Sequence, residues 1–180
     1  MEMLLFSVIT LSMVSSSYSD FRNNKITPDE ELSNLMNECK SEPNSLWIGK
    51  RCYFFNKNLQ SYEDAQDYCQ FHFDRKKTVQ KTRGRLYEPR HFSNFISMYR
   101  RAQEIFGSRY PGFWLGIDNI QNFKYASDGK SLSDATWVPW APNRPNEDSN
   151  ETCLTAFRFK WFDIKCSDIS WSICESIPDI

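Results

Sequence analysis

Apolar positions near the start of the chain recur at helical spacing. In the segment TPDEELSNLMNEC, residues 27–39, Thr27 suits an N-cap, Pro28 suits the first helical position, and Glu30 completes a capping box. The apolar stripe consists of Leu32, Leu35 and Met36. Fewer than four turns are too short for an independent coiled coil, so we expect this helix to pack on its own domain, with oligomerisation as the alternative.

Two further helices follow a strand-like segment. The run RCYFFN, residues 51–56, alternates between polar and apolar positions as a strand does. Ser61 then provides an N-cap for a helix that brings Cys69 to the core. Pro89 is expected to open a longer helix, whose aromatic and aliphatic stripe ends at Gly107.

The pattern changes after residue 112. Short runs rich in Trp, Phe, Ile and Thr are broken by Gly, Pro, Asn and Asp, which indicates antiparallel strands joined by long loops. Helices in the first half and strands in the second half predict an α+β fold.

The first twenty residues differ from the rest of the chain. An apolar run over residues 3–14 is followed by small residues, which indicates a signal peptide at 1–19 with cleavage after Ser19; a buried N-terminal strand is the alternative. We then expect an extension with a short helix at 20–38 and one domain at 39–176. No later run is apolar enough for a transmembrane anchor. The chain is therefore expected to be secreted, which suits its six cysteines.

Charge and cysteine count exclude little by themselves. Without Glu2, the 22 basic residues face 22 acidic ones, since the whole chain has 23 acidic residues. Such a balance favours neither nucleic acid nor membrane as a partner. Six cysteines allow fifteen disulfide connectivities.

Several motifs, taken in order, resemble those of C-type lectin-like domains over nearly the whole mature chain. They are CYFF before a capped helix that ends in cysteine, GRLYEP before the next helix, FWLGID at 113–118, and KWFDIKCSDISWSICE at 160–175. The resemblance implies two helices packed on antiparallel sheets with a long loop region. It also implies the long form with three disulfides, namely Cys39–Cys52, Cys69–Cys174 and Cys153–Cys166. In this family the WLGI run is a buried core strand, so Trp114, Leu115 and Ile117 are expected to be scaffold residues.

The resemblance also implies where a ligand would bind. Sugar-binding members hold one calcium ion through a Glu-Pro-Asn or Gln-Pro-Asp triplet, a glutamate before a cysteine, and an Asn-Asp pair. In this sequence Asn146, Glu151 and Asp163 match that set, whereas Arg144 and Phe162 replace two oxygen ligands. Three protein ligands are few for an ion that takes six to eight oxygens.

Arg144 brings a cation to the place where relatives hold the ion. A guanidinium about 5 Å from a divalent ion, at an effective dielectric near 20, costs on the order of 6 kcal/mol. We therefore expect no calcium or weakly bound calcium. Instead, the guanidinium is expected to bind the carboxylate of Glu151 or Asp163 and to replace the ion.

Other features of the loops have both a functional and a simpler interpretation. Asp118 and Glu147 are possible ligands for an auxiliary calcium ion, but solvated loop carboxylates are the favoured interpretation. Asn150 begins a sequon, Asn-Glu-Thr, and is the glycosylation candidate. Trp137 and Trp140 suit either ligand stacking or core packing.

A basic run separates the second helix from GRLYEP, where six of the eleven residues from 75 to 85 are basic. A mobile loop of this kind could bind anionic polymers in a salt-dependent way, although a solvated loop is more common. The candidates are Arg75, Lys76, Lys77, Lys81, Arg83 and Arg85. No nucleic-acid motif accompanies them.

The sequence lacks the residues that the common classes of enzyme need for catalysis. His72 and His91 are the only histidines, no cysteine is left over as a nucleophile, and no phosphate-binding glycine loop is present. The sequence therefore predicts a secreted, non-catalytic recognition module. Its expected partner is a glycan or a protein on a cell surface. A metal-free protein-binding domain and a binder of anionic polymers remain alternatives, and the oligomeric state stays open.

Overall fold

A computed structural model describes residues 27–74, 82–107, 112–118, 123–146 and 148–178. The predicted signal peptide at 1–19 and residues 20–26 lie outside this part. The helices are α1 (Pro28–Ser41), α2 (Tyr62–Asp74) and α3 (Phe92–Phe106), with a 3-10 turn η1 (Leu132–Asp134). The strands are β1 (Ser45–Ile48), β2 (Arg51–Gln60), β3 (Thr82–Leu86), β4 (Phe113–Asp118), β5 (Lys124–Tyr125), β6 (Cys153–Phe157), β7 (Lys160–Ile164) and β8 (Ser170–Pro178). None of the described helices is long and apolar enough to cross a bilayer.

The strands form one mixed sheet with the order β1-β2-β8-β4-β6-β7. Two shorter strands extend it, because β3 pairs with β8 and β5 pairs with β4. The pairs are antiparallel, as the turn-rich sequence predicts, with one exception. Strands β4 and β8 run parallel, with Phe113 opposite Trp171. The parallel pair arises because β8 returns to the centre of the sheet from the far end of the chain.

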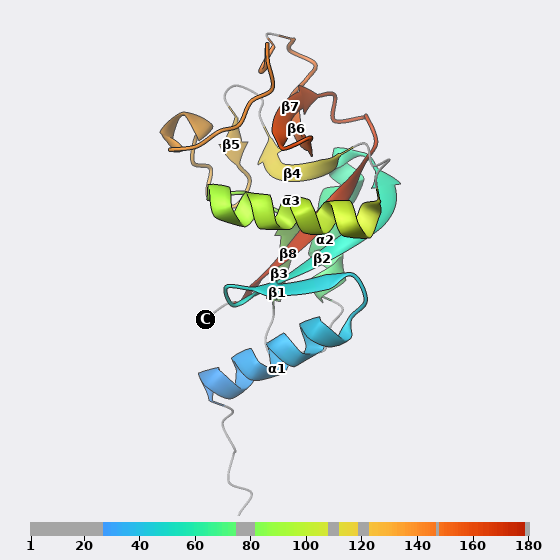
Figure 1. Cartoon of the computed structure of the whole chain (residues 1–180), viewed down its shortest axis with the longest axis vertical. Coiled ribbons are helices and arrows are strands. Elements are labelled where there is room, and N and C mark those ends of the chain that lie inside the picture. Colours follow the sequence, from blue (N-terminus) through green and yellow to red (C-terminus); the bar gives the residue numbers. More distant parts are fainter. Residues whose placement is uncertain (1–26, 75–81, 108–111, 119–122, 147, 179–180) are drawn as a thin grey trace, which may run out of the picture.

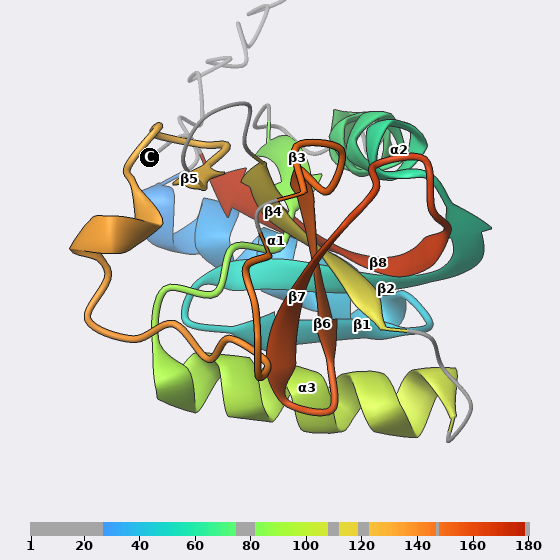
Figure 2. The same cartoon turned by 90° about the horizontal axis from the view of Figure 1, so that it is seen from above.

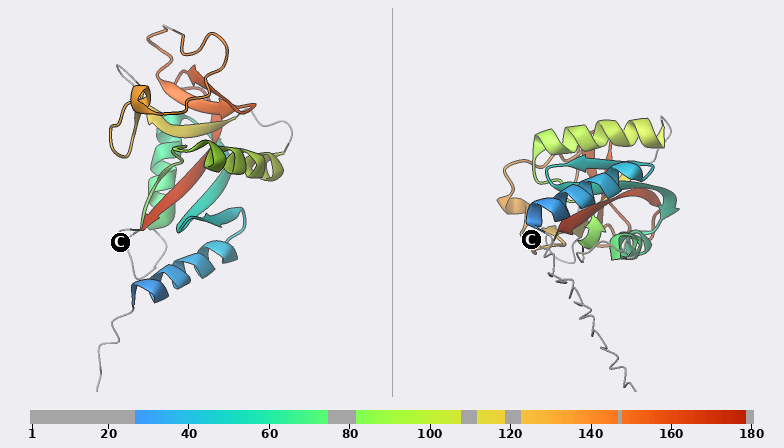
Figure 3. Two further views of the ribbon diagram at one scale, coloured as in Figure 1. Left: turned by 60° about the vertical axis from the view of Figure 1, so that its left-hand side comes forward. Right: turned by 90° about the horizontal axis from the view of Figure 1, so that it is seen from below.

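The helices lie around this sheet, and the long loops gather at one end of the molecule. Viewed from above, α2 and α3 lie on opposite sides of β2 and β8 (Figure 2). Helix α1 packs beside β1 at the end away from the loops around β5, β6 and β7 (Figures 1 and 3). The core beneath α3 is largely aromatic. Leu115 and Ile117 of the WLGI strand belong to it, whereas Trp114 belongs to a second core cluster with residues of α2 and the cysteines; all three side chains are fully buried.

The helix ends follow the predicted caps with one exception. Thr27 and Glu30 form the capping box of α1, and the Ser61 hydroxyl accepts a hydrogen bond from the Asp64 N–H (3.2 Å). Gly107, with φ 88°, ends α3. However, α3 begins at Phe92 rather than at Pro89. The segment from 87 to 90 has no regular secondary structure, and the backbone of Tyr87 is hydrogen-bonded to Ile173 of β8 and to Gly116 of β4 (2.8 Å each).

The three disulfides have the pairing that the family resemblance implies. Cys69–Cys174 joins α2 to β8 across 105 positions, whereas Cys39–Cys52 and Cys153–Cys166 each span 13 positions. Strand β3 lies directly against α2 near the long-range disulfide. At Gly84 a Cβ would lie 1.9 Å from the carbonyl oxygen of Cys69, so only glycine allows this approach.

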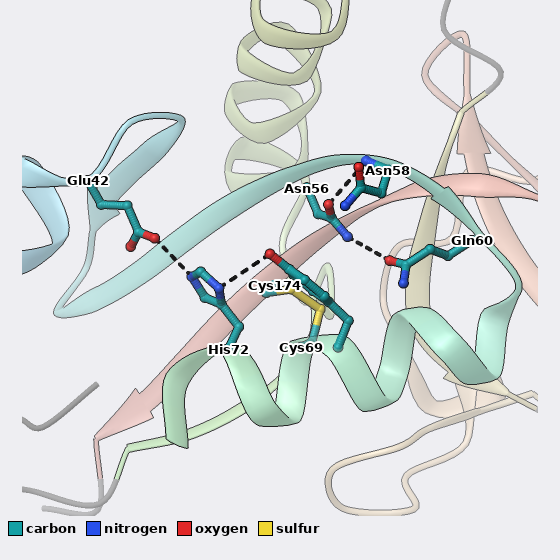
Figure 4. The surroundings of a disulfide bond; sticks show 8 residues. Glu42, Asn56, Asn58, Gln60, Cys69, His72 and Cys174 are labelled. Carbon is teal, nitrogen blue, oxygen red and sulfur yellow. Dashed lines mark hydrogen bonds and ion pairs between the residues drawn. A yellow bond between two sulfur atoms is a disulfide. The ribbon is translucent and has the colours of Figure 1, made fainter. Parts of the chain in front are cut away.

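His72 lies beside the long-range disulfide and joins α2 to the end of α1 (Figure 4). Its ring stacks on Phe54 with 4.0 Å between centroids, and its Nε2 lies 3.2 Å from a carboxylate oxygen of Glu42. Burial lowers the pKa of His72. His72 is therefore packed, and His91 is exposed.

We expect the domain to lose stability at mildly acidic pH through His72. The pKa is lower in the folded state than in the unfolded state, so the unfolded chain binds the proton more readily. The stabilisation is present above the unfolded pKa of about 6.5 and is lost as the pH falls through the folded value. Denaturant unfolding of the wild type and of His72→Phe, which keeps the stacking, measures this. The wild type should lose more stability than the variant between neutral and acidic pH; parallel pH curves would contradict the assignment.

The outer edge of the sheet is covered by the chain itself. Strand β7 pairs with β6 on one side, and on its other side the Trp161 N–H donates to the Pro139 carbonyl (2.9 Å). The Ala141 N–H donates to the Trp161 carbonyl (3.0 Å), which completes a short parallel bridge. The segment 139–141 thus fixes the start of the loop that contains Arg144.

Candidate functional site

Arg144 lies in a turn that begins directly after this bridge. Asn143 has φ 61°, a left-handed conformation that asparagine tolerates well, and the Arg144 N–H donates to the Ala141 carbonyl (3.1 Å). The peptide bond between Arg144 and Pro145 is cis. The turn brings the arginine side chain over the end of β7.

The guanidinium of Arg144 binds both of the predicted carboxylates. Its Nη1 donates to Oδ1 of Asp163 (2.9 Å), to the carbonyl oxygen of the same residue (2.7 Å), and to Oε2 of Glu151. The Asp163 side chain is fully buried, whereas those of Arg144 and Glu151 are 24% and 19% exposed. Burial lowers the pKa of Arg144, but the hydrogen bonds to Glu151 and Asp163 outweigh it, so the pKa is raised and the cation is kept.

Asn146 completes the arrangement through both its backbone and its side chain. Its N–H donates to Oδ2 of Asp163 (2.8 Å), and its side-chain Nδ2 donates to Oε2 of Glu151. Its Oδ1 accepts from the Asp148 N–H (3.0 Å). The structure thus brings all four predicted site residues into one hydrogen-bonded cluster, and each of the three candidate ligand side chains already accepts protein hydrogen bonds.

The aromatic side chains near this part of the sequence pack within the fold. Trp137 and Trp140 pack on the core, with ring centroids 5.6 Å and 6.3 Å from that of Trp161. Phe162 lies half-buried on β7, with its ring centroid 6.3 Å from that of Phe157. Of the two interpretations of Trp137 and Trp140, these contacts favour core packing.

Solved structures resemble this arrangement of strands, helices and loops. The C-type lectin CEL-I from Cucumaria echinata superposes with a TM-score of 0.62 at 19% identity, covering 77% of this chain and 98% of its own. Human lithostathine gives 0.60 at 19% identity, covering 74% and 97%. Herring type II antifreeze protein gives 0.58 at 18% identity, covering 75% and 96%. The chain has the C-type lectin fold.

The sequence comparisons add nothing to this likeness, because no family model and no curated protein sequence matches the chain. At such low identity, the structural neighbours establish the fold alone. They also include both a lectin and an antifreeze protein, so the C-type lectin fold by itself does not determine a ligand.

Of the two carboxylates predicted as auxiliary calcium ligands or solvated loop groups, the structure describes only Asp118, which is half-buried at the end of a strand. Asp118 ends β4, and burial, together with the charge of Glu88, raises the pKa of its carboxyl group. Glu147 lies outside the described residues. Among the residues that the structure describes, no group of three acidic, histidine or cysteine side chains is placed to hold a metal ion. Asn150 is exposed, and its Nδ2 donates to Oδ1 of Asp148 (3.0 Å).

The basic run is only partly described, and its end is not a loop. Arg75, Lys76, Lys77 and Lys81 lie outside the described residues, but Arg83 and Arg85 belong to strand β3. The Nε of Arg85 donates to Oε1 of the buried Glu175 (2.6 Å). The expectation of a mobile loop over the whole run is therefore wrong at this end, because pairing with β8 orders the chain. The positive charge of Arg85 is therefore paired with a buried carboxylate of the same domain.

Sequence reasoning missed a network of buried charges at the start of α3. Glu88 and Glu175 are almost fully buried, and they contact Arg51, Arg85 and Arg90. The motif GRLYEP contains two of these residues, Arg85 and Glu88, but the sequence indicates it only as a family signature. A single charged residue in an otherwise uncharged strand, such as Glu175 in SWSICES, is the signal that could have indicated a buried ion pair.

Proposed function

We propose that this chain is a secreted, non-catalytic recognition module that binds a carbohydrate or another cell-surface ligand through the loop face around Arg144, without calcium. The contact of the Arg144 guanidinium with Glu151 and Asp163 supports this most strongly. A cation that is hydrogen-bonded to both carboxylates performs one part of the task of a calcium ion in a sugar-binding lectin, because it neutralises them and holds the loop, but it does not coordinate sugar hydroxyls. Calcium would have to displace it.

The donor set supports the same proposal. A calcium ion needs six to eight oxygen ligands. Most side-chain oxygens of the three candidate ligands already accept a hydrogen bond from the protein. Phe162 adds an apolar ring where relatives have an amide oxygen. Recognition then depends on the exposed amide of Asn146, the ring of Phe162 and the surrounding loop groups.

Binding to a glycan panel, measured with calcium and again with a chelator, tests the proposal. We expect binding that is equal under both conditions, and a melting temperature that calcium does not change. Asn146→Ala should weaken the binding by about tenfold, the loss of one good hydrogen-bonding side chain. Asn58→Ala is the matched control, because Asn58 is an exposed asparagine on β2 that does not belong to the cluster around Arg144.

Three other outcomes of this experiment would contradict parts of the proposal. Binding abolished by the chelator would overturn the metal-free part of the proposal. Binding that resists the chelator but disappears with added salt would favour the basic run at 75–85 as the ligand-binding segment. Equal losses in the two alanine variants would place the ligand outside the loop face.

A metal-free protein-binding domain is the second candidate function. Phe157 and Phe162 form a half-buried aromatic pair, and the Arg158 guanidinium lies 5.1 Å from the centroid of the Phe157 ring. Aromatic and arginine side chains are enriched in protein interfaces. The absence of glycan binding under every condition would favour this candidate.

A further inference from the structure

A cavity separate from the loop face lies where the β1–β2 turn meets the start of α3. Its volume is about 250 Å³. The lining residues are Ile48, Gly49, Arg51, Tyr53, Glu88, Arg90, His91 and Asn94. None of them belongs to the cluster around Arg144.

Two arginines of this cavity come from different elements. Arg51 begins β2, and its side chain is 39% exposed. Arg90 precedes α3, and its side chain is 28% exposed and lies over the ring of Tyr125, 3.5 Å from the centroid. Guanidinium groups on facing elements can bind one oxyanion together, because each offers parallel N–H donors that match its oxygens.

The carboxylate in the lining is already hydrogen-bonded by Arg90 of the cavity and by Ser127 outside it. Oε1 of Glu88 accepts from the Ser127 N–H (2.7 Å), and its Oε2 accepts from the Ser127 hydroxyl (2.6 Å) and from Nη2 of Arg90 (2.7 Å). Both oxygens therefore have donors. Glu88 holds the Arg90 guanidinium in place and adds little free negative charge to the cavity.

Arg51 is the least neutralised cation in the neighbourhood. Its Nη1 lies 3.5 Å from Oε2 of Glu175, whereas Arg85 binds the other oxygen of the same carboxylate at 2.6 Å. Burial raises the pKa of Glu175, and this effect is larger than the lowering by Arg85 and Arg51. The charged form of the Glu175 carboxyl group is therefore less stable than it would be in water.

The side chains that line the cavity carry a small positive excess. Its lining cations are Arg51 and Arg90, and its lining carboxylate is Glu88. Outside the lining, Arg85 pairs with Glu175 and Lys130 pairs with Asp128, and the charge of Asp118 also acts on Glu88. A local excess of positive charge at a partly buried site attracts an anion more strongly than the same charge on open surface.

Asn94 adds a neutral donor in a fixed orientation. The Tyr87 hydroxyl donates to Oδ1 of Asn94 (2.7 Å), and the Asn94 NH₂ group hydrogen-bonds the Tyr53 hydroxyl, so one N–H of the amide is left to donate. Asn94 lies in the first turn of α3, which contains no acidic residue. The end of the cavity at α3 therefore offers N–H donors and positive potential.

We propose that this cavity binds a small oxyanion, a carboxylate, sulfate or phosphate group, between Arg51 and Arg90. Its volume lies below that of typical drug-sized ligand pockets, so it suits a small acid or one charged group of a larger ligand. The site does not depend on the function proposed for the loop face.

Titration calorimetry of the full chain with sodium phosphate, sodium sulfate and sodium acetate, at constant ionic strength, tests this proposal. We expect saturable binding of at least one of these anions, with a matching rise in melting temperature. Binding of acetate would identify a carboxylate site, and binding of phosphate or sulfate alone would identify a site for tetrahedral oxyanions.

Three substitutions locate the site. Arg51→Gln should weaken binding by at least about tenfold, because it removes a charge-assisted donor. Asn94→Asp keeps the acceptor for Tyr87 but adds negative charge to the cavity, so it should abolish binding. Arg100→Gln removes an exposed charge from the same helix outside the cavity and should change affinity less than about twofold.

Two results would overturn the proposal. The first is the absence of saturable binding for all three anions to the wild type. The second is an equal loss of affinity in Arg51→Gln and Arg100→Gln, since that would show a general effect of net charge. If Asn94→Asp does not fold, the comparison of the two arginine variants still decides the question.

Discussion

Replacing both Cys69 and Cys174 with alanine is expected to lower the free energy of unfolding by about 4.7 kcal/mol, the chain-entropy value for a loop of roughly 100 residues. The disulfide spans 105 positions and joins α2 to the central strand β8, so its loss frees nearly the whole domain in the unfolded state. Domains of this kind have a total stability of roughly 5–15 kcal/mol. The variant should therefore be at the margin of folding.

Urea unfolding of the wild type and of paired alanine variants measures this effect. The matched control replaces Cys153 and Cys166, whose loop spans 13 positions and should contribute only about 3 kcal/mol on the same basis. Equal losses in the two variants would contradict loop entropy as the source of the difference. A larger loss in the control would show that the disulfide near Arg144 has a special structural role.

The second large effect is expected from Arg144→Gln, which should lower the free energy of unfolding by about 3 kcal/mol, as breaking a buried ion pair from one side does. The carboxylate of Asp163 is fully buried and loses its cation, while the Asn146 N–H remains as a donor. The effect should exceed that of a surface ion pair. Thermal and denaturant unfolding at neutral pH measure it.

Two variants separate the buried charge from the loss of a side chain. The double substitution Arg144→Gln and Asp163→Asn removes both charges and should recover part of the stability. Arg101→Gln breaks an exposed pair with Glu104 on α3 and should cost about 0–1 kcal/mol. A cost for Arg144→Gln as small as that of Arg101→Gln would show that Asp163 does not depend on the guanidinium.

Features that depend on nearby residues could be predicted from the sequence. The capping box of Thr27 and Glu30, the Ser61 cap and the stop at Gly107 all involve residues within a few positions of one another. The sequence predicts that α3 starts at Pro89, but the helix starts at Phe92. Proline suits the first position of a helix, but it suits a non-helical segment before a helix as well. Tertiary packing decides between the two.

The site shows the same division between local and long-range information. The resemblance to a known family placed Arg144, Asn146, Glu151 and Asp163 near one another, and chemistry suggested that the arginine binds the carboxylates. Charge and periodicity alone contain no sign that Arg85 contacts Glu175, which lies 90 positions away. Such pairs are set by strand register, which sequence patterns do not determine.

The hydrogen bonds between segment 139–141 and the far side of β7 have a consequence for association. An open sheet edge is a template on which another polypeptide can add a strand, and proteins with such edges are prone to aggregate. Here the main-chain groups of Trp161 at that edge are already occupied by the protein's own backbone. A partner that approaches this end must therefore be recognised by side chains, and concentrated solutions should resist edge-to-edge polymerisation there.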